Sequence, residues 1–312
     1  MKLTDCSLQP LVDYYALARP ISWSGVFGRK APLVVEIGFG MGEVIRRNAK
    51  NHPDIHYVGI EQHWERFYKT MKAAGREETP LRNIRFLAVD ARVALQRLFG
   101  EKTIDHIYCL FPCPWPKKSH VKNRLFSRAF LELLNSRLKP KGQIYFVTDF
   151  YPYYQWVLEQ VNRKNFDVKT SSIQPQFDTK FERKWVGEGQ QEFFELVLTK
   201  KKHIQQKPDR DRIMKSYTLK EFSPQAFSFE DIKEDISIIF KDKLYDPALK
   251  KCLLRFVVSE EHLTQNFWVT VVWKKDKWRI CRTEGQKFFP TTGIIRTLEE
   301  VYSQARSLPQ TV

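Results

Sequence analysis

Short apolar runs alternate with helical stretches from residue 33 to about residue 200. The apolar runs read PLVVEIGFG, IHYVGIE, IRFLAVD, IDHIYCLF and QIYFVTD, and QEFFELVLTK closes the series. The stretches between them have helical spacing: EVIRRNAKNH, HWERFYKTMKAAG, ARVALQRLF, LFSRAFLELLNSRLKPKG and YPYYQWVLEQVNRK. The fourth of these is expected to close with a Lys-Pro-Lys-Gly turn. Strands that alternate with helices of this length imply a parallel sheet with helices on both faces. The sequence therefore predicts an α/β fold with a doubly wound sheet.

The pattern changes after the polar segment KKHIQQKPDRDR. Beyond it, CLLRFVVSE, FWVTVVW and WRICRTE are typical of strands, KKDK of a tight turn, and GIIRTLEEVYSQAR of an amphipathic helix. A chain of 312 residues is long enough for two domains. We expect an N-terminal segment (1–32), the α/β domain (33–202), a linker (203–212) and a second, smaller α+β domain (213–312).

The charge of the chain indicates a polyanionic partner. The net charge is +16, which favours nucleic acid, although a solvated basic surface is the plainer alternative. The five cysteines form no C-x-x-C pair, so we expect no disulfide framework, no metal site and a reducing compartment. The first residues contain no secretory signal, and the chain contains no apolar run of membrane-spanning length. We expect a cytoplasmic protein without a membrane partner.

Three consecutive predicted strands end in acidic residues. Glu36 precedes a glycine-rich turn that contains Gly38 and Gly40, Glu61 ends the next strand, and Asp90 ends the third. Taken singly, such a turn can be only a tight turn, and such an acid only a helix N-cap. Together they lie at the carboxyl edge of the sheet, where these folds bind ligands. The set favours an adenosine ligand without pyrophosphate, S-adenosylmethionine.

The loop after the fourth strand reads LFPCPWPKKSHVKNR. Three prolines exclude a helix or an inner strand there and predict a stiff surface loop. Trp115 could hold a purine by stacking, although core packing is the alternative. The basic side chains after it could bind phosphates; they are Lys117, Lys118, Lys122 and Arg124.

Residues 33–200 resemble the bacterial tRNA (guanine-N7-)-methyltransferase family. The resemblance rests on EIGFGMG, GIE, FPxPWPKKxHxKxR, VTD and TKFE. It implies a Rossmann-like methyltransferase sheet in which the three strand-end carboxylates bind the methyl donor. It also implies a set of residues that contact the tRNA substrate: Lys117, Asp149, Thr179, Lys180, Phe181 and Glu182.

One position departs from the family pattern. The family's proline loop opens with an aspartate that lines the donor site and is considered catalytic, whereas this chain has Cys113 there. A thiol carries no carboxylate charge and accepts hydrogen bonds poorly. Guanine N7 has a free lone pair and no proton to remove, so alignment of the reactants can supply most of the catalysis. We expect a weaker enzyme or a rearranged site in which Glu182 or Asp149 is the acceptor, and an inert, half-buried Cys113 rather than a nucleophile.

The predicted function is methyl transfer from S-adenosylmethionine to N7 of a guanine, position 46 of the tRNA variable loop. The alternative is a tRNA-binding protein that keeps the fold but has lost efficient turnover. Methylation of another RNA base or of a protein is a third hypothesis, because a fold alone does not choose a substrate. The sequence leaves the oligomeric state and the tRNA selectivity open.

The role of the last hundred residues is also open. Their predicted strands carry several lysines and arginines, some of which should share one face of a sheet; they are Lys274, Lys275, Lys277, Arg279 and Arg282. Such a face could hold the body of a tRNA, or the region could be a stabilising or dimerising appendage.

Overall fold

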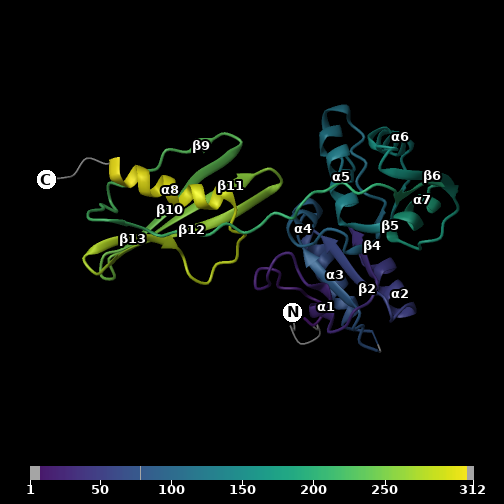
Figure 1. Cartoon of the computed structure of the whole chain (residues 1–312), viewed down its shortest axis with the longest axis horizontal. Coiled ribbons are helices and arrows are strands. Elements are labelled where there is room, and N and C mark those ends of the chain that lie inside the picture. The colour runs from purple at the N-terminus through teal and green to yellow at the C-terminus, as the bar shows by residue number, and fades with distance from the viewer. Residues whose placement is uncertain (1–7, 78, 308–312) are drawn as a thin grey trace. The chain divides into compact units, whose positions relative to one another are not determined.

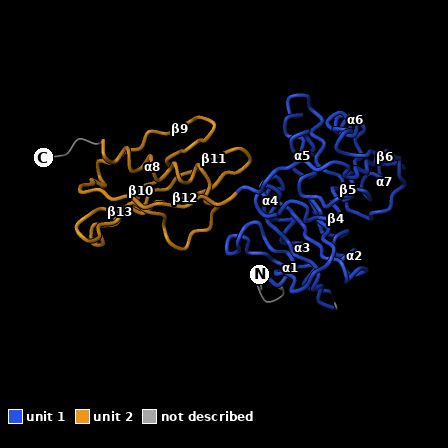
Figure 2. The backbone as a smooth tube through the Cα atoms, viewed as in Figure 1, with its two compact units in different colours: residues 1–209 blue, residues 210–312 orange. Residues whose placement is uncertain are grey.

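The chain forms two compact units, Met1–Asp209 and Arg210–Val312, in a computed structural model (Figure 2). The structure describes residues 8–77 and 79–307. Unit 1 contains residues 203–209, which we expected to belong to a linker, as well as the described part of the N-terminal segment. Within the described residues, no helix is long and apolar enough to cross a membrane.

Unit 1 is built on a seven-stranded sheet in the order β3-β2-β1-β4-β5-β7-β6, with helices on both faces (Figure 1). The first five of these strands run parallel, and β7 pairs antiparallel with both β5 and β6. Its strands are β1 (Leu33–Ile37), β2 (His56–Glu61), β3 (Ile84–Ala88), β4 (Ile104–Leu110), β5 (Leu138–Thr148), β6 (Phe166–Ile173) and β7 (Phe193–Lys200). The predicted doubly wound α/β class is confirmed.

The first helix of unit 1 precedes β1, and the other helices lie in the connections between these strands. They are α1 (Trp23–Phe27), α2 (Glu43–Asn51), α3 (Trp64–Ala74), α4 (Ala91–Arg97), α5 (Arg128–Arg137), α6 (Tyr151–Gln160) and α7 (Lys180–Gly187), with a 3₁₀ helix η2 (Lys118–Asn123). All five residues of β1 and all six of β2 are buried, as expected for inner parallel strands covered on both faces.

The Lys-Pro-Lys-Gly turn that we expected to close the helix over LFSRAFLELLNSRLKPKG belongs instead to a strand. The helix α5 ends at Arg137, and the next five residues already belong to β5. Leu138 pairs with Ile104 of β4, and the register shifts before Gln143 pairs with His106. Lys141 has a φ of 63° within this irregular stretch. The Lys-Pro-Lys-Gly segment is therefore an irregular beginning of a strand rather than the end of a helix.

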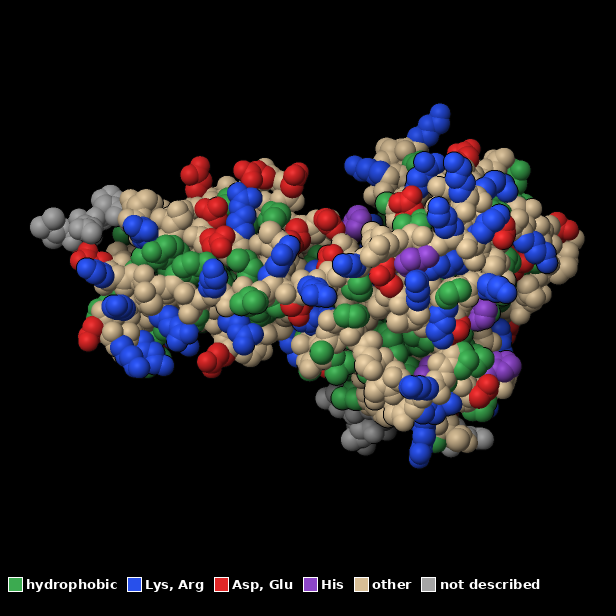
Figure 3. All heavy atoms as spheres, viewed as in Figure 1, with side chains coloured by type: hydrophobic (Ala, Val, Ile, Leu, Met, Phe, Trp, Pro, Cys, Tyr) green, Lys and Arg blue, Asp and Glu red, His purple; other side chains and the backbone are tan. Residues whose placement is uncertain are grey.

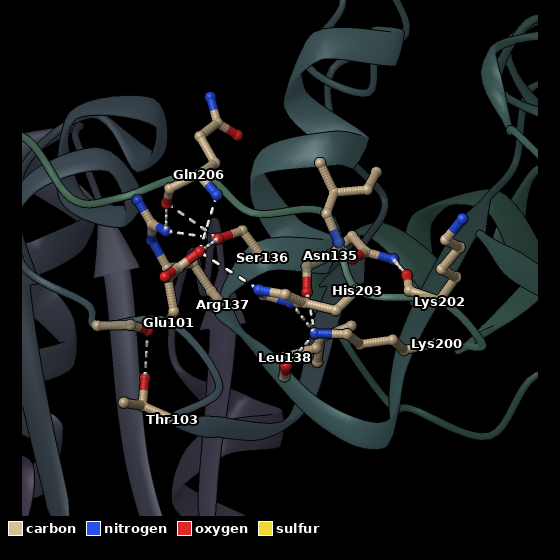
Figure 4. A network of polar contacts seen from close by, with 12 residues as sticks. Glu101, Thr103, Asn135, Ser136, Arg137, Leu138, Lys200, Lys202, His203 and Gln206 are labelled. Carbon is tan, nitrogen blue, oxygen red and sulfur yellow. Dashed lines mark hydrogen bonds and ion pairs between the residues drawn. The ribbon is translucent and has the colours of Figure 1, made fainter.

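The chain beyond β7 turns back over α5 and is fixed there by a network of polar contacts (Figure 4). At its centre is Arg137, which is fully buried and donates through Nε to the carbonyl of Leu95 (2.7 Å) and through Nη1 to the carbonyl of Gln206. The backbone N–H of Gln206 donates to Glu101 (2.8 Å), which also accepts from the Ser136 hydroxyl (3.1 Å). The charge of Arg137 is thus matched by oxygen acceptors on both sides.

A second part of the network holds the start of this segment. Lys200 donates to the carbonyls of Asn135 (2.7 Å) and Leu138 (2.6 Å), and burial lowers the pKa of its ammonium group to about 8. The Asn135 side chain donates to the carbonyl of Lys202 (3.0 Å) and accepts from the N–H of Ile204 (2.9 Å). Buried polar groups that are satisfied in this way fix one path for the chain.

Unit 2 is a six-stranded antiparallel sheet in the order β8-β13-β12-β11-β10-β9, packed on helix α8 (Thr292–Ser307). Its strands are β8 (Tyr217–Leu219), β9 (Ile232–Lys233), β10 (Ile236–Asp246), β11 (Lys251–Glu260), β12 (Leu263–Lys274) and β13 (Lys277–Arg282). The second, smaller α+β architecture is confirmed, and β8, β9 and β10 are strands that the sequence reading did not identify.

The basic residues of β13 do not all lie on one face. Lys277 and Arg279 alternate with the buried Trp278 and Ile280, so they lie on the face away from α8. Arg282 lies two residues after Ile280, so its side chain points to the same face as Trp278 and Ile280. The tight turn predicted for KKDK is confirmed, since Lys275 and Asp276 both have positive φ between two paired strands.

Candidate functional site

The glycine-rich turn connects β1 to α2 and is closed by α3. Gly38, Gly40 and Gly42 all have positive φ, which side chains rarely adopt. A Cβ on Gly42 would lie 2.3 Å from Cγ2 of Thr70. The Thr70 hydroxyl donates to the carbonyl of Gly40 (3.0 Å). The glycines therefore allow both the turn and its close contact with α3.

Glu61 ties this turn to the end of β2. Its carboxylate accepts from the N–H of Gly40 (3.1 Å) and from the N–H of His63 (2.9 Å), and the side chain is almost fully buried. One carboxylate thus fixes both the glycine turn and the entry to α3. Each oxygen keeps lone pairs that could accept hydrogen bonds from the two hydroxyls of a ribose.

Glu36 is the most perturbed carboxyl group at this edge. It is 6% exposed, and burial raises its pKa to about 8. The Arg47 guanidinium opposes this rise and Glu43 adds to it. A buried acid with this pKa is mostly protonated at neutral pH, so a cationic ligand that stabilises its anionic form would bind with release of a proton.

Asp90 is the N-cap of α4. Its carboxylate accepts from the backbone N–H of Arg92 (2.8 Å) and from two nitrogens of the Arg92 guanidinium (3.1 and 2.8 Å). The N-cap alternative for this residue is confirmed, and its contact with a ligand stays a prediction.

The proline loop leaves β4 at this same edge, directly after Leu110. Phe111 has a φ of 53° and Trp115 a φ of 46°. The Phe111 ring packs edge-on against Phe177 and Phe193, at centroid distances of 6.4 and 5.0 Å. Cys113 is exposed, which differs from the expected half-buried thiol. The loop is therefore stiff at its base and presents Cys113 to solvent.

The Trp115 ring is half-buried and meets His120 edge-on at 5.8 Å. Trp115 is therefore neither a core residue nor freely exposed. After it, Lys117 caps η2, and the lysines expected to bind phosphates are exposed there: Lys117, Lys118 and Lys122.

The expectation that Arg124 binds phosphate is wrong. Its side chain is 8% exposed and donates to the carbonyl of Pro114 (2.9 Å). The guanidinium lies over the rings of Tyr153 and Trp156, at 5.1 and 5.3 Å. Arg124 therefore holds the proline loop to α6, and its position next to three lysines in the sequence concealed this role.

The Thr-Lys-Phe-Glu run opens α7. Thr179 is the N-cap, and its hydroxyl accepts from the N–H of Glu182 (3.0 Å). The buried Glu182 carboxylate accepts from three consecutive N–H groups, those of Gln176 (2.8 Å), Phe177 (3.1 Å) and Asp178. These contacts make Glu182 a support of the loop before α7, which disfavours the expected role of Glu182 as an acceptor for the substrate. The T-x-x-E spacing is a helix-cap signature that could have indicated this.

Two side chains of α2 bring this run to the glycine turn, 140 residues earlier in the chain. Glu43 accepts from the backbone N–H of Lys180 (3.1 Å) and pairs with Arg183 (2.6 Å). Arg47 donates to the carbonyl of Phe177 (2.8 Å). No local pattern in the sequence indicates these contacts. Phe181, by contrast, is 40% exposed, and its ring lies 5.7 Å from the guanidinium of Arg66 on α3.

Asp149 follows β5 at the same edge. It is half-buried, and burial raises the pKa of its carboxyl group. Its carbonyl accepts from Gln190 (3.1 Å), which fixes the chain between β5 and β7. The following Tyr151 is 47% exposed and packs on Phe194 at 4.9 Å.

The carboxyl ends of the parallel strands thus gather carboxylates, a glycine turn, a stiff aromatic loop and the start of α7. Glu36, Glu61 and Asp90 lie on β1, β2 and the start of α4, while Cys113 and Asp149 follow β4 and β5. This sheet order and this distribution of acids define a Rossmann-like methyltransferase, a fold with a place for S-adenosylmethionine at that edge.

Comparisons with known proteins agree with this class. Residues 30–195 match the family model described as "Putative methyltransferase". The tRNA (guanine-N(7)-)-methyltransferase of Thermotoga maritima is 32% identical over 90% of this chain and 92% of its own length. The enzyme of the same name from Chlorobium phaeobacteroides is 42% identical over 55% of this chain and 83% of its own length. The chain belongs to the tRNA (guanine-N(7)-)-methyltransferase family.

A solved structure of an antibiotic-related methyltransferase is also similar, with a TM-score of 0.46 and 20% identity over 57% of this chain and 92% of that one.

Proposed function

We propose that this chain transfers a methyl group from S-adenosylmethionine to N7 of the guanine at position 46 in the variable loop of tRNA. The main support for this proposal is that the glycine turn, the proline loop and the start of α7 meet at one edge of the sheet in a chain of this family. S-adenosylmethionine supplies an electrophilic methyl group on a sulfonium. Guanine N7 supplies the lone pair, so no proton has to be removed by the protein.

The donor would be held by the carboxylates at the ends of the first three strands. Glu61 would accept from the ribose hydroxyls, and the proximity of its oxygens to the turn and to the start of α3 supports this role. Asp90, at the end of β3, would serve the adenine side. Glu36 would face the cationic part of the donor, where its ionised form is favoured.

The guanine would be held by the proline loop and the segments beside it. The indole of Trp115 would stack on the base, and Lys117 would contact a phosphate. Asp149 is the remaining candidate acceptor for the N–H groups of the base, since the Glu182 carboxylate already accepts from backbone N–H groups. Thr179, Lys180 and Phe181 would place the substrate from α7.

Incubation of the protein with labelled donor and unmodified tRNA, followed by mapping of the methylated nucleotide, tests this function. Label at N7 of the variable-loop guanine supports it. Donor and tRNA binding without transfer to any guanine would favour a tRNA-binding protein that has lost turnover.

The thiol provides a separate test of the site. If Cys113 only replaces a useful carboxylate, Cys113→Asp should keep or raise kcat, and Cys113→Ala should change kcat by less than about threefold, because no thiol chemistry is involved. A complete loss of transfer in Cys113→Ala, with unchanged donor affinity, would show that the sulfur has a chemical role.

A further inference from the structure

The positive charge of the chain is concentrated in unit 1. Residues 1–209 contain 34 Lys and Arg against 22 Asp and Glu, whereas residues 210–312 contain 18 against 14. Figure 3 shows lysine and arginine side chains spread across the visible face of unit 1. A polyanion should therefore find its main electrostatic contacts on the methyltransferase unit.

A basic hollow lies between α2 and α3, and none of the donor carboxylates is among its lining residues. It has a volume of about 450 Å³ and is lined by Arg46, Lys69, Lys72, Ala73, Arg76 and Glu77. Lys69, Lys72 and Arg76 are spaced by three and four residues. They therefore line one side of α3 and of the turn that follows it. We call this hollow the α2–α3 groove.

The positive charge of the α2–α3 groove exceeds what its own acids can neutralise. Glu77 pairs with Arg46 (2.6 Å) and Lys50 (3.8 Å), and Lys69 pairs with Glu65 (2.6 Å). Lys72 and Arg76 add further cations to this set.

One donor in the wall of the groove is also unsatisfied. The Nε of Arg46 is buried and has no hydrogen-bond partner among the residues that the structure describes. A buried donor without a partner is costly, and an anionic oxygen or a water could satisfy it.

The groove runs along α3, which leads away from the carboxyl edge of the sheet where Glu61 lies. The helix α3 begins at Trp64, three residues after Glu61. With a rise of 1.5 Å per residue, Lys69 lies roughly 8 Å, Lys72 roughly 12 Å and Arg76 roughly 18 Å along the axis from that start. At the near end, Arg66 contacts Phe181 of the α7 run. Cations spaced over this length can contact several phosphates of one polynucleotide strand, whereas a single small anion would contact only one or two of them.

We propose that the α2–α3 groove binds the sugar-phosphate backbone of the RNA substrate. The proposal rests on the proposed function, because the RNA is taken to be the tRNA that is methylated. The groove would position the tRNA body through charge and hydrogen bonds to phosphates, independently of base sequence.

The test compares two triple variants of the full chain. Lys69→Ala/Lys72→Ala/Arg76→Ala removes the α3 side of the groove. The matched control removes three exposed cations around the start of β6, at the opposite edge of the sheet: Arg163→Ala/Lys164→Ala/Lys169→Ala. Affinity for an unmodified tRNA transcript is measured from 0.05 to about 0.3 M salt, and S-adenosylmethionine affinity is measured alongside.

The groove variant should bind tRNA at least about tenfold more weakly at low salt, and the slope of log affinity against log salt should fall by about 2 to 3. The control should change both quantities much less, and S-adenosylmethionine affinity should stay the same in both. Lys69→Arg/Lys72→Arg should retain the tRNA affinity, because it keeps the charge. An unchanged slope in the groove variant, or an equal loss in the control, would overturn the proposal.

The two proposals fail differently. If the chain methylates no tRNA yet the groove variant still loses RNA affinity and slope, the groove stands and the reaction assigned above falls. If tRNA is methylated and the groove variant binds it as the unaltered chain does, the reaction stands and the groove falls.

Discussion

Replacement of Glu36 by glutamine should stabilise the protein increasingly as pH rises. In the folded chain this carboxyl group has a pKa of about 8, against an ordinary value of 4.5, because burial penalises its charge. An acid with a raised folded-state pKa releases its proton more readily when the chain unfolds, so its destabilising effect begins near the unfolded pKa and is complete above the folded one. Glutamine has nearly the same shape and does not ionise.

The size of the effect follows from the two pKa values. One pKa unit corresponds to about 1.4 kcal/mol, so the difference in unfolding free energy between Glu36→Gln and the unaltered chain should grow from about 1 kcal/mol at pH 5 to about 3 kcal/mol at pH 7. It should level off above pH 8. Urea unfolding of both proteins across this range, followed by tryptophan fluorescence, measures the difference directly, and unit 2 contributes equally to both.

Ionisation of Glu36 should lower the stability of the fold but raise its affinity for the donor. If the bound sulfonium favours ionised Glu36, affinity for S-adenosylmethionine should rise with pH up to about 8 in the unaltered chain, and the Glu36→Gln variant should lack this component of the pH dependence. Calorimetry in buffers of different ionisation enthalpy should detect release of nearly one proton at pH 7. A stability difference that stays constant from pH 5 to pH 8 would refute the reasoning, because it would mean that Glu36 ionises normally in the fold.

Three further substitutions test supports of the site. Gly42→Ala should cost about 2–4 kcal/mol in urea unfolding, since it places a Cβ at positive φ and displaces Thr70; an unchanged midpoint would contradict this. Arg124→Ala should lower kcat/KM by about 10- to 100-fold with unchanged donor affinity, because the loop at Pro114 loses its cation–π anchor, and Arg124→Lys should recover only part of it. Glu182→Gln should cost about 1–3 kcal/mol in thermal unfolding and weaken tRNA binding, because its amide would face a backbone N–H; equal stability would show that the carboxylate is not needed there.

The sequence predicted the first unit well because each of its strands has a local signature. Runs such as PLVVEI and IHYVGIE are buried on both faces, and the helices between them repeat with helical spacing. Local pattern failed where a tertiary contact decides the structure. The segment after Arg137 continues as a strand because Leu138 pairs with β4, and nothing in its own composition records that partner.

The candidate site divides in the same way. Acids at strand ends could be located from the sequence, since the position of an acid at the end of an apolar run is a local fact. What each side chain binds could not. Arg124 belongs to a basic run, yet two aromatic rings and a carbonyl of the proline loop surround it, while Glu182 uses its carboxylate on the preceding loop. Both outcomes depend on residues that only the folded chain brings near.

The polar network that holds residues 200–209 against α5 sets an order of events during synthesis. Arg137 leaves the ribosome about 70 residues before the carbonyl of Gln206, which it needs as an acceptor. Until then the Arg137 guanidinium, which is fully buried in the finished fold, lacks one of its acceptors. The methyltransferase unit can therefore reach its final packing only after its last segment has emerged, although every strand of its sheet has been made by residue 200. If the ribosome pauses after residue 200 but before Gln206 has emerged, the sheet is complete while the surface of α5 that residues 200–209 cover is still exposed. A nascent-chain chaperone could bind there.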